Sequence, residues 1–336
     1  MNLMFQNPIT AAEIKKKARG LGADLVGIAD GKIMDRHPPN PRLPQTPDRI
    51  TSYDGDRCIV MAMRYSVGTT RLPRVDERHK YYNDELTLTA LETASLELVL
   101  WLEDQGYPAL IVPPTHVDPW VYFGEPDQHT NTILSLTHAA VEAGLGTLGM
   151  AEQLITPEFG PRVMLTAVLT SAPVEPDTKR TEALCIGARC GRCVQTCPAS
   201  AVSHFDRDWE ACDKHRSPHG FHALADHLSN LIDEPDPEEK KRLLRTKDQF
   251  YIWQSMLRGA GVVTGCRRCQ DVCPVGDDYA RLEDVLADIP ENTSEKMRRL
   301  SEYAKAEESD RLPEVYRTSE RWFGTLVRKI DPNSQN

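Results

Sequence analysis

The sequence predicts a mixed α/β (α+β) domain followed by a ferredoxin-like module. Two observations predict it. Apolar strand-like runs alternate with helical patterns over residues 1–175, which is typical of layered α/β structure. Eight of the nine cysteines then fall between Cys185 and Cys273, in two runs that each end in Cys-Pro. We expect a first domain at 1–175, the cysteine-rich module at 176–285 with a helical insertion at 213–265, and a C-terminal helical tail at 286–336.

The first half of the α/β domain is predicted to begin with a helix. Thr10-Ala-Ala-Glu13 has the pattern of a capping box, and glycines at 20 and 22 end the helix. A buried strand follows at Asp24–Ala29. Residues 30–55 are rich in proline and aspartate and predict a loop. A second apolar strand is expected at Cys58–Tyr65, with Cys58 as a buried thiol.

A long amphipathic helix is predicted from about Asn83, because apolar residues recur at helical spacing up to Leu102. Gly106 is placed to cap its end. Tyr107–Val112 is a third strand candidate, residues 131–143 a further helix, and Val163–Thr170 a fourth strand.

The cysteine spacing indicates iron–sulfur chemistry. The first run is Cys185-x4-Cys190-x2-Cys193-x3-Cys197-Pro, the second is Cys266-x2-Cys269-x3-Cys273-Pro, and Cys212 lies between them. Cys-x2-Cys-x3-Cys-Pro is the bacterial ferredoxin spacing, in which the cysteine before proline ligates the other cluster. We therefore expect two [4Fe-4S] clusters, one held by Cys185, Cys190, Cys193 and Cys273 and the other by Cys197, Cys212, Cys266 and Cys269.

Structural zinc and disulfides are the alternative uses of these cysteines. Zinc is also bound by Cys-x2-Cys pairs, but it does not explain Pro198 and Pro274. A disulfide framework suits small secreted domains, whereas 336 residues can build a core without it. The N-terminus has no feature of an export signal.

Composition narrows the function classes. Hydrophobic residues make up 40% of the chain, and no apolar run approaches the roughly 20 residues of a membrane span. A net charge of -10 argues against a protein whose main task is to grip a nucleic-acid backbone. Free thiols and the absence of an export signal predict a cytoplasmic protein without membrane attachment.

The segment Gly144-Leu-Gly146-Thr-Leu-Gly149 matches the string G-x-G-x-x-G. A dinucleotide site needs a strand before this string, and here a helical pattern precedes it, which disfavours NAD or FAD. Two interpretations stay open. The segment is either a helix cap with a turn, or a loop whose backbone can approach a large ligand closely.

The residues around this segment carry a resemblance. Residues 143–149, followed by Leu154-Ile-Thr-Pro-Glu-Phe-Gly-Pro-Arg-Val163, look like the corrinoid domain of cobalamin-dependent reductive dehalogenases. The related epoxyqueuosine reductases share the glycine loop, the Cys-Pro motifs and an isolated cysteine such as Cys212. The resemblance covers roughly residues 10–280 and is specific in 143–163 and 185–274.

The resemblance implies a corrinoid-binding first domain that holds cobalamin in its base-off form. It implies that the corrinoid is reduced through the two clusters. The implied cofactor-binding residues are Gly144, Gly146, Gly149, Thr156, Glu158 and Gly160.

The sequence departs from both families at sites that bear on the reaction. Both families usually have Arg or Lys directly after the glycine loop, and this chain has Met150. Epoxyqueuosine reductases carry an aspartate proton donor where this chain has Thr130, and Asp127 is out of register. These departures weaken the queuosine hypothesis.

A tyrosine is the proton donor in many reductive dehalogenases. Tyr82 and Tyr81 are the candidates here, followed by Tyr122. A phenol with its pKa of about 10 protonates a substrate well only if a nearby cation lowers that pKa, and Arg78 or Lys80 could do so. The alternative is that one ring of the Tyr-Tyr pair simply packs in the core.

Together these observations predict an enzyme, a reductive dehalogenase-like oxidoreductase that cleaves a carbon–halogen or carbon–oxygen bond in a small-molecule substrate. A ferredoxin or flavodoxin would supply the electrons. One alternative is an epoxyqueuosine reductase, whose substrate is tRNA. The other is an electron-transfer iron–sulfur protein that binds no corrinoid.

Overall fold

A four-stranded antiparallel sheet forms the centre of the computed structural model, which describes residues 6–72, 78–114, 132–258, 265–281, 289 and 291–326. The strand order is β1-β2-β6-β3. The strands are β1 Leu25–Asp30, β2 Arg57–Arg64, β3 Ala109–Val112 and β6 Val163–Thr170. All four predicted strands are present, with ends within two residues of those expected. Every pairing is antiparallel, so the α+β description applies and not the parallel sheet of repeated βαβ units.

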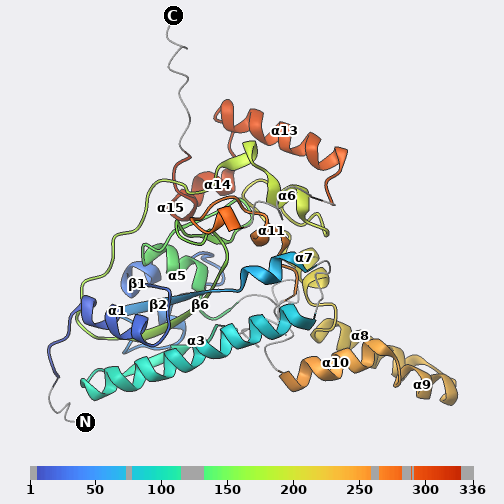
Figure 1. The fold of residues 1–336 in the computed structure, drawn as a ribbon, viewed down its shortest axis with the longest axis horizontal. Helices are drawn as coiled ribbons and strands as arrows, with labels where there is room; N and C mark the ends of the chain where they lie inside the picture. Colours follow the sequence, from blue (N-terminus) through green and yellow to red (C-terminus); the bar gives the residue numbers. More distant parts are fainter. Residues whose placement is uncertain are drawn as a thin grey trace, which may run out of the picture.

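Helices cover both faces of the sheet (Figure 1). On one face, α1 (Ala11–Gly20) and α3 (Arg78–Asp104) pack against Ile59 and Met61. On the other, α5 (Leu136–Glu142) packs against Cys58, Val60 and Ala62. Burial on both faces explains why β2 is an uninterrupted apolar run. Cys58 is fully buried, and burial raises the pKa of its thiol to about 12, so it is the strand thiol that the sequence predicts.

Local sequence explains how α1 begins. The Thr10 hydroxyl accepts a hydrogen bond from the Glu13 amide at 3.2 Å, and the Glu13 carboxylate accepts one from the Thr10 amide at 2.8 Å. This reciprocal pair satisfies two otherwise unpaired donors at the helix start, and it confirms the predicted capping box.

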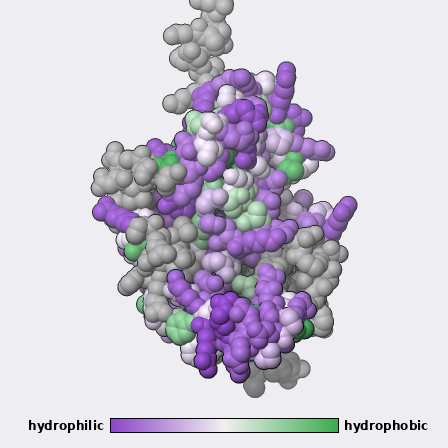
Figure 2. Space-filling model, turned by 90° about the vertical axis from the view of Figure 1, so that its right-hand side faces the viewer, coloured by the Kyte–Doolittle hydropathy of each residue, from purple (hydrophilic) through white to green (hydrophobic). Residues whose placement is uncertain are grey.

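The cysteine-rich region consists of short elements joined by turns, and both the elements and the turns carry thiols. The elements are η4 (Gly187–Arg189), α6 (Arg192–Thr196), α7 (Trp209–Arg216) and α11 (Arg268–Asp271). Helices α8 (Phe221–Asp233), α9 (Pro237–Leu243) and α10 (Lys247–Arg258) form an arm that extends away from the sheet (Figure 1). The face of the molecule on that side is mainly hydrophilic (Figure 2).

The C-terminal helices are α13 (Ser294–Glu308), α14 (Glu314–Thr318) and α15 (Glu320–Phe323). The sequence suggests one or two surface helices here. Instead, Tyr316, Trp322 and Phe323 are buried in the core that includes α5 and the second sheet face. The sheet, the cysteine-rich region and the C-terminal helices therefore share one hydrophobic core.

The remaining elements are α2 (Gly31–Arg36), η1 (Pro47–Arg49), η2 (Val67–Arg71), β4 (Thr147–Leu148), β5 (Leu154–Ile155) and η6 (Tyr279–Arg281). The loop expected at 30–55 thus contains one short helix and one 3-10 turn. Across the described ranges, the helices lack the combination of length and apolar composition that a bilayer span requires.

Candidate functional site

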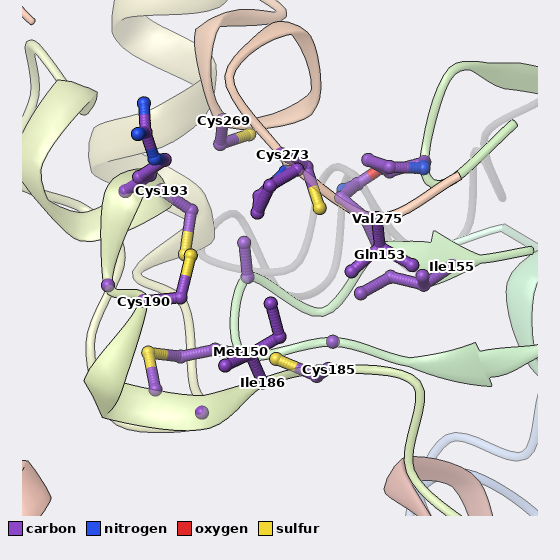
Figure 3. Close-up of a pocket in the computed structure, with 17 residues that line it drawn as sticks. Met150, Gln153, Ile155, Cys185, Ile186, Cys190, Cys193, Cys269, Cys273 and Val275 are labelled. Atoms are coloured by element: carbon purple, nitrogen blue, oxygen red, sulfur yellow. The ribbon is translucent and has the colours of Figure 1, made fainter. Parts of the chain in front are cut away.

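Five cysteines line one cavity beside the glycine-rich segment, and four of them are the residues that the sequence assigns to one cluster (Figure 3). We call Cys185, Cys190, Cys193 and Cys273 the first set. The rest of the cavity wall is largely apolar and includes Met150, Ile155, Ile186 and Val275. Cys269 also reaches this wall.

The backbone around the first set turns sharply between thiols. Gly187 and Gly191 have φ angles of +81° and +55°, in the left-handed region that favours glycine. These two turns flank η4 and bring Cys185 and Cys190 to the same cavity as Cys193 on α6. Helix α11 packs against α6, which places Cys273 on the opposite wall.

Burial and mutual repulsion keep these thiols protonated in the absence of a cation. Burial raises the pKa of Cys185 to about 11 and that of Cys273 to about 12. The neighbouring thiols Cys185, Cys269, Cys273 and Cys190 raise the pKa of Cys193 further. Backbone amides of Met150 and Gly187 oppose the shift at Cys185. Bound iron would replace the thiol protons, because the thiolate is the metal ligand.

The other four thiols form a second group. We call Cys197, Cys212, Cys266 and Cys269 the second set. The Cys269 thiol interacts electrostatically with Cys212 and Cys197, and the Cys266 thiol with Cys269 and Cys212. The Cys197 sulfur accepts a hydrogen bond from the Ala201 amide at 3.2 Å. These neighbours belong to one predicted set, but Cys269 also interacts with Cys193 of the first set, so the division into two sets stays a prediction.

A buried arginine lies between two thiols of the second set. The Arg207 Nη2 donates to Cys269 Sγ at 3.5 Å and to the Ala151 carbonyl, and its Nη1 lies 3.9 Å from Cys212 Sγ. The guanidinium carbon lies 4.7 Å from the centroid of the Trp209 ring. The sequence contains no signal that singles out Arg207, because its position depends on the folding of the chain between the two motifs.

The donor sets fit iron–sulfur clusters. Two groups of four thiols are the ligands that two four-iron clusters require. Among the residues that the structure describes, no three His, Cys, Asp or Glu side chains converge on a single-ion position. The thiols of the first set line a cavity instead, as ligands around a multi-iron group do.

The stretch Thr156–Arg162 docks onto the chain that follows Cys273. Thr156 and Gly160 exchange backbone hydrogen bonds at 2.9 Å and close a tight turn. Asp277 and Asp278 donate backbone N–H groups to the carbonyls of Pro157 and Glu158. Gly160 has a φ of +53°, and an added Cβ would lie 1.9 Å from the Val275 carbonyl oxygen.

The buried Arg162 side chain stabilises the same junction. Its side chain is 1% exposed and donates to the carboxylate of Asp278 at 2.6 and 2.8 Å. It also donates to the carbonyls of Cys273 and Val275, each at 2.7 Å. The Ile-Thr-Pro-Glu-Phe-Gly-Pro-Arg segment therefore holds the second Cys-Pro motif against the sheet domain.

The glycines of the segment 144–149 approach the protein's own chain. A Cβ on Gly144 would lie 2.6 Å from the Thr178 carbonyl oxygen, and one on Gly146 would lie 1.9 Å from that of Ile155. At Gly149 it would meet the Ile155 side chain at 2.4 Å and the Cys185 sulfur at 3.8 Å. The turn interpretation explains these glycines without a ligand, and Gly149 borders the cavity of the first set.

A buried polar network joins α3 to α11 near the second set. Lys80 donates to Asp271 at 2.9 Å, and both side chains are under 5% exposed. Arg267 pairs with the buried Asp84, and its guanidinium carbon lies 3.7 Å from the ring centroid of Tyr65. Lys80 is therefore engaged with a carboxylate, whereas the sequence suggests it as the cation beside a tyrosine proton donor.

Tyr65 is a functional candidate that sequence reasoning missed. Within the described ranges its buried hydroxyl has no hydrogen-bond partner, and burial raises its pKa. Tyr82 lies on α3 with its side chain 41% exposed. The side chain of Tyr81, together with Tyr122, Asp127 and Thr130, lies outside the described part of the chain.

Helix α13 braces the cysteine loops. The Glu307 carboxylate accepts from the Ala188 amide at 2.9 Å and lies 3.0 Å from His204 Nε2. Lys296 is 4% exposed and donates to three carbonyls, including that of Cys197 at 2.7 Å. This contribution of the tail is not visible in the sequence, because 99 residues separate Lys296 from Cys197 and 119 separate Glu307 from Ala188.

The comparisons with known proteins agree with the resemblance of the sequence. No protein-family model matches the chain. The chain is 39% identical over 79 residues to the tetrachloroethene reductive dehalogenase of Sulfurospirillum multivorans, which is 23% of this chain and 15% of that protein. It is 41% identical over 158 residues to the epoxyqueuosine reductase of Listeria monocytogenes, which is 46% of this chain and 34% of that protein.

A solved structure supports the fold. A reductive dehalogenase described as acting in B12-dependent dehalogenation matches 92% of this chain and 38% of its own, with a TM-score of 0.51 and 17% identity. The matched regions of the two curated relatives cover about a third of their length or less. The homologues are reductive dehalogenases and epoxyqueuosine reductases, which confirms the superfamily that the sequence resembles.

Proposed function

We propose that this protein is a cobalamin-dependent iron–sulfur oxidoreductase of the reductive dehalogenase type. The observation that carries the proposal is the convergence of the four thiols of the first set on one cavity. The first set would hold one [4Fe-4S] cluster and the second set the other. Single electrons would pass from a ferredoxin or flavodoxin through the two clusters, in a cytoplasmic enzyme with a small-molecule substrate.

The corrinoid part of the proposal rests on the relatives. When bound, a corrinoid would supply the cobalt centre at which a carbon–halogen or carbon–oxygen bond is reductively cleaved. The candidate contacts are Gly144, Gly146, Gly149, Thr156, Glu158 and Gly160. The close approaches of these glycines are to the protein's own chain, so their geometry adds no separate support for a corrinoid.

The protein's own residues would position the clusters and deliver a proton. Arg162 and the turn at Thr156–Gly160 hold the Cys273 loop, and α13 holds the loop of Cys185 and Cys190. Tyr82 or Tyr81 on α3 would supply the proton to the reacting carbon or leaving group. The same helix reaches the neighbourhood of the second set through Lys80.

Two other functions each have an observation in their favour. The longer alignment, 158 residues at 41% identity, is to an epoxyqueuosine reductase, which favours tRNA as the substrate. The packing of the glycine segment favours an electron-transfer protein without a corrinoid. Close approach to the protein's own chain accounts for these glycines without any ligand.

Anaerobic reconstitution with iron, sulfide and hydroxocobalamin separates these functions. We expect about eight iron atoms, about eight acid-labile sulfides and one cobalt per chain. Iron without cobalt would support the electron-transfer protein, and stoichiometric zinc would overturn the cluster assignment. For the cobalt-loaded protein, reduction of a halogenated aromatic supports the leading function. Restored queuosine in a strain that lacks its own reductase would instead establish the tRNA alternative.

A further inference from the structure

Arg207 is a buried cation that lies close to two cysteine sulfur atoms. Its side chain is 7% exposed, and its two terminal nitrogens point to Cys269 and Cys212. Within the described ranges no carboxylate forms an ion pair with its guanidinium, and the charge of the buried Glu152 acts on it from farther away. A charge buried in this way is costly unless an opposite charge compensates it. The thiolates of the second set are the anions at hand.

Lys296 is a second buried cation that lies near a thiol of the second set. Its ammonium group donates to the carbonyls of Gln195, Cys197 and Glu291 at 2.7 to 3.0 Å. These three acceptors are neutral, and the described residues include no carboxylate in ion-pair contact with it. The Cys197 thiol acts on this lysine most strongly, and the more distant Glu291 carboxylate acts in the same direction. Among the described residues, Arg207 and Lys296 therefore place beside the second set two buried positive charges without a carboxylate in ion-pair contact, and Glu152 and Glu291 act on them only from farther away.

Other buried cations of the region each form an ion pair with a carboxylate. Arg162 is neutralised by Asp278, Lys80 by Asp271, and Arg267 by Asp84. The wall around the first set is mainly apolar, with side chains such as Met150, Ile155 and Val275, and the one cation among the described residues that line it is the partly exposed Arg192, whose charge acts on Cys190. The two sets thus have the same ligands but different electrostatic surroundings.

We propose that Arg207, together with Lys296, raises the reduction potential of the second-set cluster above that of the first-set cluster. This inference rests on the proposed function, because it requires both clusters. One-electron reduction adds one negative charge to a cluster, and a nearby buried cation stabilises that charge strongly at low dielectric. Hydrogen bonds to the sulfurs act in the same direction. An electron from an external one-electron donor therefore comes to rest on the second-set cluster.

The test is a redox titration with dithionite, followed by electron paramagnetic resonance, on wild type, Arg207→Gln and Arg207→Lys. Arg207→Gln removes the charge and keeps a donor group. We expect its second-set cluster to be harder to reduce by at least about tenfold in equilibrium constant, which is about 59 mV for one electron. Arg207→Lys keeps the charge and should shift the potential much less.

Single-cluster backgrounds identify which cluster responds. In Cys212→Ala protein, only the first-set cluster remains, and Arg207→Gln should leave its potential unchanged. In Cys193→Ala protein, the remaining second-set cluster should shift. Arg189→Gln removes an exposed charge near Cys190 and serves as the matched control without effect. If Arg207→Gln loses the cluster, Lys296→Met provides the same test through a different side chain.

The outcomes separate this inference from the proposed function. Wild-type protein that holds no iron after reconstitution overturns both. Two clusters whose potentials are unaffected by Arg207→Gln, or by Lys296→Met where that variant is used, overturn the inference alone. Equal shifts in the Gln and Lys variants also overturn it, because charge would then not be the cause. A shift confined to the second-set cluster supports it.

Discussion

The thiols of the first set line a largely apolar cavity, whereas two thiols of the second set, Cys212 and Cys269, lie against a buried guanidinium. Both sets draw on the same two Cys-Pro motifs, so spacing alone cannot distinguish them. The difference comes from chain segments between and after the motifs, which contribute Arg207 and Lys296. It shows that motif spacing selects the ligands, while distant residues select the electrostatic environment.

The largest expected effect is the loss of one cluster at a time. Cys212→Ala should remove the second-set cluster and Cys193→Ala the first-set cluster, because each removes one of four ligands. Iron and sulfide content should fall from about eight to about four per chain in each variant. Cys58→Ala is the control that should keep both clusters. Loss of all iron in either ligand variant would contradict two separable sets.

Asp278→Ala should strongly destabilise the junction that serves the first set. It would leave the Arg162 guanidinium buried without its carboxylate, and breaking such a pair costs about 3–5 kcal/mol. The free energy of unfolding and the spectrum of the first-set cluster should both change. Glu238→Ala removes an exposed pair with Lys241 and should cost under about 1 kcal/mol. Equal stabilities of these two variants would refute the role of Arg162.

Gly146→Ala tests whether the glycine segment serves packing or a ligand. An added Cβ would collide with the Ile155 carbonyl, so we expect a loss of about 1–3 kcal/mol in unfolding free energy without any corrinoid present. Gly20→Ala is the matched control, because nothing lies within 4 Å of its added Cβ. An unchanged stability for Gly146→Ala, combined with weaker cobalamin binding, would restore the ligand-approach interpretation.

The smallest expected effect is a pH dependence of folding stability that arises from Glu152, a carboxylate that interacts with Arg207. Burial raises the pKa of Glu152 to about 7, although Arg207 lowers it. Between its ordinary value of 4.5 and about 7, the folded state keeps a proton that the unfolded state has released, so stability falls as pH rises. Glu152→Gln should flatten thermal stability across this window. The exposed Glu238→Gln should not, and an unchanged slope in Glu152→Gln would contradict the raised pKa.

The fold could be predicted from the sequence to the extent that its signals are local. The capping box at Thr10 and the four strands depend on neighbouring residues and are confirmed. The antiparallel order β1-β2-β6-β3 depends on pairings between distant segments, which periodicity does not encode. The burial of Tyr316 and Trp322 likewise depends on where the tail docks.

At the site, spacing singles out the eight cysteines, and the family resemblance singles out the segment 154–163 that holds Cys273, but neither predicts the contacts of that segment. Thr156 and Gly160 close a protein turn, a role that motif resemblance does not reveal. Arg207, Tyr65 and Lys296 gave no sequence signal, because each acquires its neighbours only through tertiary structure. Residues such as Thr130 and Tyr122 lie outside the described ranges, so their predictions stay predictions.

A redox titration of the reconstituted wild-type protein, followed by electron paramagnetic resonance, tests the central claim most directly. We expect two one-electron steps from two [4Fe-4S] clusters, with the higher potential belonging to the cluster that Cys212→Ala removes. A single step from about four iron atoms per chain, or a higher potential for the first-set cluster, would contradict it.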